Sequence, residues 1–453
     1  MMSLSQAAIA VGGKLQGKDA VFTAVSKDTR TLMQGDLYIA LKGENFDGHA
    51  FLDQAANMGA VGALVSELQS SALPQIYVAD TRIALGNLAA EWRRQFKGKL
   101  AAITGSNGKT TVKEMCRAIL QKQVGEEHVL STQGNLNNDI GMPMTLLSIR
   151  DQHDYAVIEM GANHVAEINY LTKIARPNVA VITNAGPAHL EGFGSIEKVA
   201  QAKAEIYGGL VEDGVAIINL DDDYADYWQQ LCQGKCVKTF SMKNEKADIY
   251  AQAVDDSAYV FKTESGDIKV SMNVPGRHNV MNALAATAVT LALGASPEDI
   301  AAGLNSFAGV SGRLNVQQGL KGARIIDDTY NANPLSLNAA MDVLTSIQGE
   351  SILVLGDMAE LGGSSESLHF AAGRHAQELG VDRLYATGNL SRHAVVGFGE
   401  GAEFFEDREA LISMLVDQIS DATTVLVKGS RSMKMENIVK ALLVPDNNNK
   451  RAN

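Results

Sequence analysis

Hydrophobic runs along the chain fall into three stretches with different patterns. Up to residue 98 the runs are short, as at residues 37–41 (LYIAL) and 61–65 (VGALV), and the polar, glycine-rich residues 42–49 lie between them. Glycine combined with aspartate and asparagine is typical of a loop. The pattern predicts a small α/β domain over residues 1–98.

Longer apolar runs, rich in β-branched residues and separated by helical patterns, follow from residue 99. Such continuous runs are typical of strands in a parallel sheet that helices cover on both faces. They lie at residues 100–104, 155–158, 179–182 and 215–218. Residues 249–274 instead alternate in short strands around a Ser-Gly-Asp turn at residues 265–267, which predicts an antiparallel hairpin added to the sheet. We expect a central domain over residues 99–312.

The last stretch alternates strands and helices again, which predicts a second doubly wound, Rossmann-like α/β domain over residues 313–444. Its apolar runs lie at residues 323–326, 352–355, 383–386 and 424–427, and its helical patterns at residues 335–347 and 411–419. The polar residues 445–453 (PDNNNKRAN) predict a disordered tail. The expected fold class is therefore α/β, with three domains.

The formal net charge of −13 narrows the range of partners. Nucleic acid needs a basic surface and is not expected to bind, whereas phosphate ligands need only a few cations and backbone N–H groups. No apolar run approaches the ~18 residues that span a bilayer, and the N-terminus lacks a signal-peptide pattern. The cysteines Cys116, Cys232 and Cys236 lack the spacing of a structural zinc site. We expect a cytoplasmic protein without a membrane span.

The strongest local motif is residues 104–111 (TGSNGKTT), which follow an apolar strand and open a helix. A strand, a glycine-rich turn and a helix N-terminus together form a cradle for phosphates. We expect Lys109 to reach the β- and γ-phosphate oxygens and the Thr110 hydroxyl to bind Mg2+. The helix carries one apolar stripe at helical spacing, formed by Val112, Met115, Cys116, Ile119 and Leu120.

This phosphate loop is a shortened variant. The usual motif has glycine at the position of Ile103, whereas this loop turns at Gly105 and Gly108. A glycine-rich turn without a ligand would not explain the Lys-Thr pair directly after the second glycine. The residues expected to bind the nucleotide here are Gly105, Ser106, Asn107, Gly108, Lys109, Thr110 and Thr111.

Further motifs follow this loop along nearly the whole chain. They lie at residues 132–143 (TQGNLNNDIGMP), 158–164 (IEMGANH), 192–195 (GFGS), 327–334 (DDTYNANP), 355–362 (LGDMAELG) and 427–431 (VKGSR). Together with the phosphate loop, and in this order, they resemble the Mur ligases, which build the peptide stem of peptidoglycan. The resemblance implies a UDP-sugar-binding domain, a central ATP-binding domain and a C-terminal ligase domain. We expect a monomer.

Within the family, these motifs are most similar to ligases that add D-alanyl-D-alanine to UDP-N-acetylmuramoyl-tripeptide. The resemblance implies that the tripeptide carboxylate attacks the γ-phosphate of ATP and forms an acyl phosphate, from which the dipeptide amine displaces phosphate. Carboxylate and triphosphate are both anions, so positive charge is needed at the γ-phosphate. Lys109 would supply one charge, and two Mg2+ ions would supply the rest.

The resemblance assigns the catalytic and magnesium site to Lys109, Thr110, Glu159, His189 and Lys203. Glu159 ends an apolar strand, where a parallel sheet holds metal ligands, although a carboxylate there can also cap the next helix. His189 follows another strand, and a lone loop histidine is more often a surface residue. Lys203 cannot bind Mg2+ as an ammonium, so its role requires carbamylation by CO2; an ordinary solvated lysine is the alternative.

The adenine-side segment of the family resembles residues 276–282 (GRHNVMN), in which two asparagines at i, i+3 can share one helix face. A helix cap followed by an ordinary helix is the alternative for this segment. The resemblance implies contacts to the base from this segment, and to phosphates and ribose from the third domain. The residues expected to make them are His278, Asn279, Asn282, Arg313 and Asp328.

Substrate contacts are implied in all three domains, and an ordinary surface loop is the alternative for each residue. The residues are Ser26, Arg30 and Lys42 for the UDP-sugar, Asn135, Asn137 and Asn138 for the muramoyl peptide, and Lys428, Ser430 and Arg431 for the incoming dipeptide or the stem.

Two other functions remain open from the residues alone. A tripeptide or folylpolyglutamate ligase of the same superfamily typically carries a Tyr-Ala-His-type sequence where residues 330–333 of this chain read YNAN. A nucleotide-dependent switch protein would lack a large third domain with its own KGSR loop. The third stem residue, diaminopimelate or lysine, is not decided by the sequence. We expect the third domain to move about residue 312 during turnover.

Overall fold

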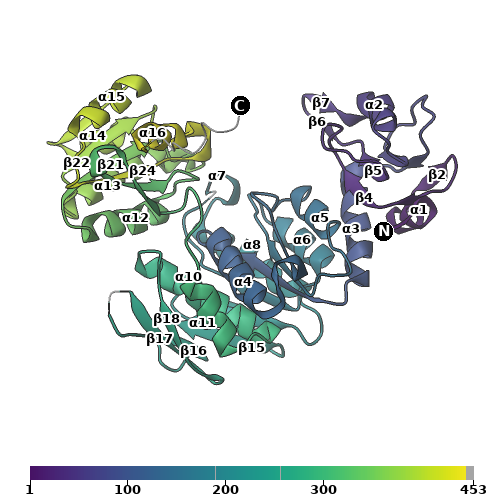
Figure 1. The fold of residues 1–453 in the computed structure, drawn as a ribbon, viewed down its shortest axis with the longest axis horizontal. Helices are drawn as coiled ribbons and strands as arrows, with labels where there is room; N and C mark the ends of the chain where they lie inside the picture. The colour runs from purple at the N-terminus through teal and green to yellow at the C-terminus, as the bar shows by residue number, and fades with distance from the viewer. Residues whose placement is uncertain (189, 256, 445–453) are drawn as a thin grey trace.

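The computed structural model describes residues 1–188, 190–255 and 257–444, and its elements form three α/β units. Figure 1 shows the N-terminal and C-terminal units at opposite ends of the molecule, with the central unit between them. The predictions for His189 and for the tail at residues 445–453 lie outside the described residues. Because the central unit lies between the other two, it contacts both of them.

The N-terminal unit is built on a five-stranded sheet in the order β2-β9-β8-β5-β4. The two apolar runs form its buried strands β5 (Asp36–Ile39) and β8 (Gly62–Val65). Residues 42–49, predicted as a loop, contain a short antiparallel hairpin, across which Nζ of Lys42 lies 3.5 Å from Oδ2 of Asp47. The other elements are β1 (Met2–Ser3), α1 (Leu4–Val11), β2 (Lys14–Gln16), β3 (Val21–Phe22), β4 (Ala24–Ser26), β6 (Lys42–Gly43), β7 (Phe46–Asp47), α2 (Leu52–Asn57), β9 (Gln75–Tyr77) and α3 (Thr81–Gln95).

The central unit is built on a nine-stranded sheet in the order β11-β12-β10-β13-β14-β15-β16-β17-β18. Its strands are parallel up to β16, and β16 to β18 are antiparallel, as the alternating pattern predicted. The hairpin turn is one residue earlier than expected, because Gly266 pairs with Thr263 and so belongs to a strand. The strands are β10 (Lys99–Thr104), β11 (Val129–Ser131), β12 (Tyr155–Glu159), β13 (Val179–Ile182), β14 (Val215–Asn219), β15 (Cys236–Ser241), β16 (Ile249–Ala253), β17 (Ala258–Thr263) and β18 (Gly266–Ser271).

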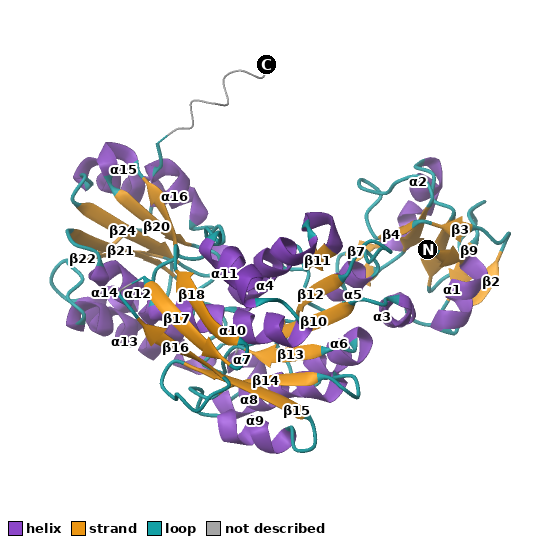
Figure 2. Ribbon diagram, turned by 60° about the horizontal axis from the view of Figure 1, so that its bottom comes forward, coloured by secondary structure: helices purple, strands orange, loops and turns teal. Residues whose placement is uncertain are grey.

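Helices cover both faces of this sheet, as Figure 2 shows. The apolar stripe predicted after the phosphate loop is fully buried, which fixes the loop against the sheet. The loop follows β10, which lies between β12 and β13, so it occupies the point at which the strand order reverses and ligands commonly bind. The helices are α4 (Lys109–Val124), α5 (Gly141–Leu146), α6 (Glu167–Ala175), α7 (Leu190–Phe193), α8 (Ile196–Ala204), α9 (Ala225–Leu231), α10 (Arg277–Leu293) and α11 (Pro297–Asn305).

The C-terminal unit has a six-stranded sheet in the order β19-β20-β24-β21-β22-β23, with β19 antiparallel at one edge and the others parallel. The four apolar runs expected in this unit form β20, β21, β22 and β24. The elements are β19 (Asn315–Gln318), β20 (Arg324–Asp328), α12 (Pro334–Ser346), β21 (Glu350–Gly356), α13 (Ser365–Glu378), β22 (Arg383–Thr387), α14 (Arg392–Phe398), β23 (Ala402–Phe404), α15 (Arg408–Gln418), β24 (Thr423–Lys428) and α16 (Glu436–Leu442).

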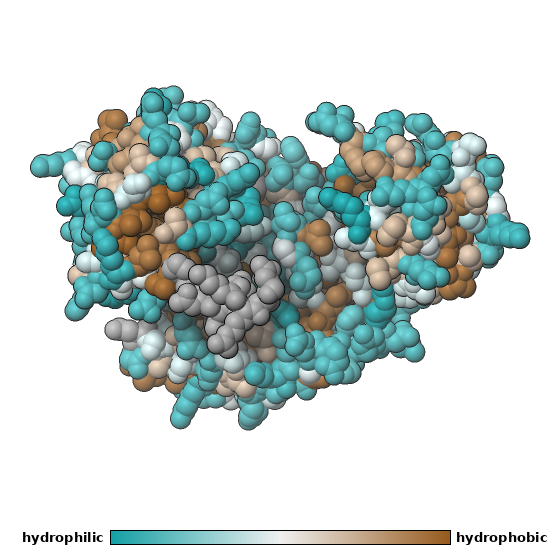
Figure 3. Space-filling view, turned by 45° about the horizontal axis from the view of Figure 1, so that its top comes forward, coloured by the Kyte–Doolittle hydropathy of each residue, from teal (hydrophilic) through white to brown (hydrophobic). Residues whose placement is uncertain are grey.

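Helix α3 links the first two units because it packs against α1 on one side and against α5 and α6 on the other. Arg93 of α3 holds this contact by donating from Nε to the carbonyl oxygen of Ala175 at 2.7 Å. Hydrophilic residues dominate the face of the molecule drawn in Figure 3. Within the described ranges, no helix has both the length and the apolar composition needed to cross a membrane.

Candidate active site

The phosphate loop depends on its two glycines. Gly105 (φ 152°) and Gly108 (φ 81°) have positive φ angles that side chains disfavour. A Cβ on Gly105 would lie 1.8 Å from the Thr183 hydroxyl, and one on Gly108 would lie 2.3 Å from Oδ1 of Asn282. The shortened loop therefore tolerates no side chain at either position.

Lys109 opens helix α4 and folds back over the loop. Its Nζ donates to the carbonyl oxygens of Gly105 at 2.7 Å and Ser106 at 3.3 Å. Burial lowers the pKa of Lys109, and the Glu159 carboxylate opposes this shift. The ammonium thus lies where the loop would receive a phosphate, held by carbonyl groups that a phosphate oxygen can replace.

The end of β13 holds the other side of the loop. The backbone N–H of Asn107 donates to Oδ1 of Asn184 at 3.0 Å, and Nδ2 of Asn184 donates back to the Asn107 carbonyl at 3.1 Å. The Thr183 hydroxyl donates to the same carbonyl at 2.5 Å. Asn184 was not predicted as a site residue, although its place after a buried strand beside the phosphate loop was a usable signal.

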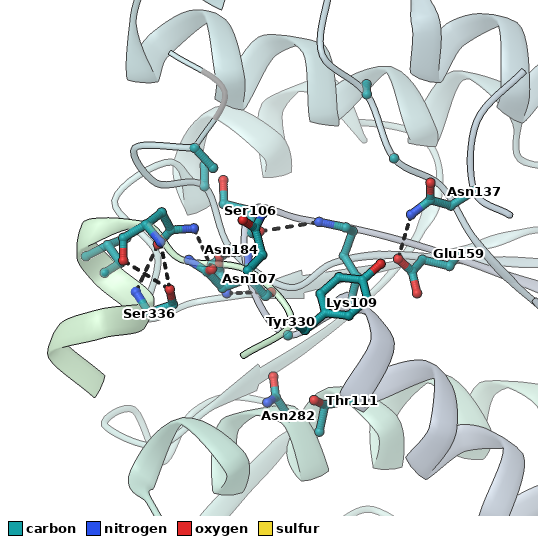
Figure 4. A pocket seen from close by; sticks show the side chains of 18 of the residues that line it. Ser106, Asn107, Lys109, Thr111, Asn137, Glu159, Asn184, Asn282, Tyr330 and Ser336 are labelled. Carbon is teal, nitrogen blue, oxygen red and sulfur yellow. Dashed lines mark hydrogen bonds between the residues drawn. The ribbon is translucent and has the colours of Figure 1, made fainter. Parts of the chain in front are cut away.

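Glu159 ends β12 and is buried, with 2% of its surface exposed. The Thr110 hydroxyl donates to Oε2 at 2.8 Å, and Nδ2 of Asn137 donates to Oε1 at 2.8 Å, as Figure 4 shows for Asn137. The backbone N–H of Glu159 donates to the Thr132 hydroxyl at 2.9 Å. A buried carboxylate beside a hydroxyl and an amide is a set of oxygen ligands that suits Mg2+.

Lys203 of α8 is also buried, with 2% of its surface exposed. Burial lowers the pKa of Lys203 well below its ordinary value, and the charge of Lys109 lowers it further. In the described ranges, no three side chains of histidine, cysteine, aspartate or glutamate gather into a metal cluster. A magnesium site would therefore need hydroxyl groups, a modified lysine or His189 in addition to Glu159.

The first two turns of α10 place the predicted adenine-side residues beside the phosphate loop. Asn279 and Asn282 are buried, and Nδ2 of Asn282 donates to Oδ1 of Asn279 at 3.2 Å. Nδ2 of Asn279 donates to the Pro275 carbonyl at 2.7 Å. Burial lowers the pKa of His278, which favours a neutral ring of the kind that stacks on a base.

Three side chains of the C-terminal unit lie beside the phosphate loop. A guanidinium nitrogen of Arg313 donates to the Thr110 hydroxyl at 3.0 Å, and its carbon lies 4.2 Å from the centre of the Tyr330 ring. Nδ2 of Asn333 donates to Oδ1 of Asn107 at 2.8 Å. Tyr330 and Asn333 were not predicted as site residues. They lie in the DDTYNANP motif, of which only Asp328 was predicted as a site residue.

These groups line one cavity of about 1480 Å3 between the central and C-terminal units, and Arg82 and Ile83 of α3 also belong to its lining. It brings together most of the residues predicted for nucleotide and peptide. Those that line it are Ser106, Asn107, Gly108, Lys109, Thr111, Asn135, Asn137, Asn138, Glu159, His278, Asn279, Asn282, Arg313, Asp328 and Lys428.

Two of the predicted residues in the C-terminal unit already have each other as partners. Lys428 is 1% exposed and forms an ion pair with Asp328, and its Nζ also donates to the Asn331 carbonyl at 3.0 Å. The Ser430 hydroxyl accepts from the Ala359 N–H at 2.7 Å. Arg431 is exposed and pairs with Glu436 at 3.2 Å.

The predicted UDP-sugar residues lie in the N-terminal unit and do not line this cavity. Arg30 pairs with Asp28 at 2.6 Å, Lys42 pairs with Glu67 at 3.3 Å, and the Ser26 hydroxyl donates to the Asp28 carbonyl at 3.0 Å. Arg30, Asp28 and Ser26 form a polar cluster at the end of the edge strand β4, and Lys42 forms a second group with Glu67 and Asp47.

A phosphate loop, a buried carboxylate and a cavity shared by two α/β units define a class of nucleotide-dependent enzyme that couples two substrates. Residues 103–290 match the Mur ligase middle domain, residues 312–431 match "Mur ligase, glutamate ligase domain", and residues 21–93 match "Mur ligase family, catalytic domain". The chain belongs to the Mur ligase family.

Three relatives illustrate the likeness. The chain is 45% identical over 447 residues to the UDP-N-acetylmuramoyl-tripeptide--D-alanyl-D-alanine ligase of Escherichia coli, covering 97% of this chain and 98% of the relative. The structure of UDP-N-acetylmuramoylalanyl-D-glutamyl-2,6-diaminopimelate--D-alanyl-D-alanyl ligase from Acinetobacter baumannii is 37% identical, with a TM-score of 0.86 and 97% of each chain covered. The MurF ligase of Thermotoga maritima in complex with ADP is 28% identical, with a TM-score of 0.82 and coverage of 92% and 96%.

Proposed function

We propose that this chain is an ATP-dependent ligase that joins the terminal carboxylate of UDP-N-acetylmuramoyl-tripeptide to the amine of D-alanyl-D-alanine. The observation that carries the proposal is the shared cavity, with Lys109 and Glu159 on the wall formed by the central unit and Arg313 on the wall formed by the C-terminal unit. The names of relatives that match this chain from end to end support the substrates.

The reaction has two steps. In the first, a carboxylate oxygen of the tripeptide bonds to the γ-phosphorus of ATP as the bridging oxygen leaves with ADP. In the second, the dipeptide nitrogen bonds to the acyl carbon, phosphate leaves with the former carboxylate oxygen, and the nitrogen loses a proton. Lys109 and Arg313 place positive charge where the two anions meet, and such fixed charge is worth most in a site with little water.

Thr110 and Glu159, with His189 and Lys203, would hold two magnesium ions. When bound there, Mg2+ neutralises charge on the phosphate oxygens. For Lys203 this role requires its neutral amine to form a bond to the carbon of CO2, releasing a proton and leaving a carbamate. The burial of Lys203 and its lowered pKa support that chemistry, because only the neutral amine is a nucleophile.

The remaining contacts follow from where the side chains lie. The first two turns of α10, with His278, Asn279 and Asn282, would contact adenine, and Asp328 would contact ribose. The polar cluster around Arg30 would bind the UDP group, and the loop carrying Asn137 would bind the muramoyl peptide. Lys428, Ser430 and Arg431 would serve the dipeptide. We expect these roles in a monomeric, cytoplasmic enzyme with domains near residues 1–98, 99–312 and 313–444.

The test is phosphate release and amide formation measured with ATP, tripeptide and dipeptide, each omitted in turn. The proposal expects both products only when all three are present, and expects Lys109→Met to lower the rate at least ~100-fold. Lys122→Met is the matched control, because Lys122 lies on the same helix and is exposed. Steady phosphate release with ATP alone would instead favour a nucleotide-dependent switch protein.

A further inference from the structure

An ion pair between the N-terminal and central units lines the cavity. Arg82, in the first turn of α3, forms two hydrogen bonds with the Asp139 carboxylate of the central unit, one of them 2.8 Å long from a terminal guanidinium nitrogen to Oδ1. Both residues line the cavity, and their side chains are 58% and 30% exposed. The pair therefore presents one cationic and one anionic group to a ligand in the cavity.

The surroundings of this pair suit a short aliphatic chain. Ile83, beside Arg82, lines the cavity and is 57% exposed, and Tyr170 of α6 lines it as well. The Tyr170 hydroxyl reaches this place because α3 has Gly86 one turn after Arg82, where a Cβ would lie 2.0 Å from that hydroxyl oxygen. A glycine inside a helix destabilises that helix by about 1 kcal/mol relative to alanine. The space that Gly86 leaves for the Tyr170 hydroxyl offsets this cost.

The pair lies close to the reacting end of the peptide. Asn137 contacts the Glu159 carboxylate, and Asp139 follows it by two residues, so their Cα atoms are at most about 7.6 Å apart. The tripeptide carboxylate must approach the γ-phosphate near Lys109 and Glu159. The side chain of its last residue then starts within reach of Arg82 and Asp139.

We propose that Arg82 and Asp139 bind the end of the third stem residue's side chain. They would select a residue that carries both an ammonium and a carboxylate there, as 2,6-diaminopimelate does. Arg82 binds the carboxylate, Asp139 binds the ammonium, and Ile83 and Tyr170 flank the methylene groups. Lysine offers only the ammonium, so it would separate the ion pair without giving Arg82 a new partner. This inference rests on the proposed ligase function and adds the groups that determine its specificity.

The experiment compares two substrates, the UDP-muramoyl tripeptides ending in meso-diaminopimelate and in L-lysine, by kcat/KM for amide formation. We expect the wild-type enzyme to prefer diaminopimelate, and Arg82→Met to reduce that preference about two- to fivefold, the size that a partly exposed charged contact supports. Arg82→Lys keeps a cation and should retain part of the preference. Arg94→Met is the matched control, because Arg94 lies on the same helix, is also 58% exposed and also forms an ion pair.

Each outcome has one meaning. Equal losses with both tripeptides would show that the pair only fastens α3 to the central unit, and a wild-type enzyme without preference would equally overturn the inference. Neither result would affect the ligase function. Failure of the wild-type enzyme to form amide with either tripeptide would instead overturn the proposed function.

Discussion

Single buried side chains in this protein hold several segments at once. Glu159 contacts the phosphate-loop helix, the asparagine loop and the end of β11, so its carboxylate is fixed before any ligand binds. Lys428 and Asp328 do the same in the C-terminal unit, where their ion pair also joins Asn331 and the N–H of Leu314. Fixed charges of this kind require no rearrangement when charge develops in a reaction.

At the residue scale, Lys428→Met should strongly destabilise the C-terminal unit, because it leaves Asp328 buried without a counter-charge. We expect a loss of about 3 kcal/mol in the free energy of unfolding, measured by urea denaturation. The double variant Asp328→Asn with Lys428→Met should recover part of this loss. Lys440→Met, which changes an exposed lysine nearby, should have little effect. Strictly additive losses in the double variant would contradict this account.

The sequence identified charged and glycine residues of the site better than its neutral ones. Lys109 and Glu159 were predictable because their types and their places after strands match phosphate and metal chemistry. Asn184, Tyr330 and Asn333 were missed, since an amide or a ring has no fixed role until the fold shows what it faces. Arg82 and Asp139 are distant in the chain, and only the packing of α3 on the central unit brings them together.

Among the elements, α13 and the loop after β21 are joined by a buried histidine. Nε2 of His369 accepts from the Met358 N–H at 2.9 Å, and its Nδ1 donates to the Ser365 carbonyl at 2.7 Å. Acceptance at Nε2 requires a neutral ring, because a protonated ring has no free lone pair there. Burial lowers the pKa of His369 below its ordinary value of 6.5, so the folded protein resists protonation at this site. The loop it holds continues into the cavity wall at Leu361.

This histidine should make stability depend on pH. Above the unfolded pKa of about 6.5 the ring is neutral in both states, and below it the unfolded chain binds a proton that the folded chain excludes. Stability therefore falls as pH falls from about 6.5 towards the lower folded pKa. We expect His369→Gln to flatten the decline in Tm between about pH 7 and about pH 5. His375→Gln, on the same helix, is the control, and an unchanged slope in the His369 variant would refute the assignment.

Sequence patterns predicted helices and strands better than they predicted the neutral side chains of the site. Continuous apolar runs predicted four strands in each of the two larger sheets, because strands buried on both faces have few other options. The strands β11, β15, β19 and β23 were not predicted. The short hairpin within residues 42–49 was missed, since two-residue strands are too short to carry a periodic signal. The antiparallel hairpin of β17 and β18 was predicted, but its turn begins one residue earlier than expected.

At the scale of the whole molecule, the active site is assembled by contacts between units. Asn333 reaches Asn107, and Arg313, next to the boundary near residue 312, reaches Thr110. A nucleotide and a peptide placed between these walls would bring new contacts to both. The N-terminal unit is fastened differently, through the packing of α3 on the central unit, so the C-terminal unit is the one expected to move.

We therefore expect small-angle scattering to change when a non-hydrolysable ATP analogue and the tripeptide are added together. The radius of gyration should decrease, because binding draws the C-terminal unit towards the central one. The Lys109→Met variant, which loses its phosphate contact, should show a smaller change at the same concentrations. An unchanged profile for the wild-type protein under saturating ligand would rule out closure.

A cavity divided between separate walls also has a consequence for inhibitor design. A small fragment that touches only the phosphate loop, or only the Tyr330 side, gains only part of the available contacts and should bind weakly. Two such fragments joined by a linker of matching length would gain affinity through effective concentration, without any new contact. The same joined compound would hold the two walls together, so it would block the opening that releases product as well as the binding of substrate.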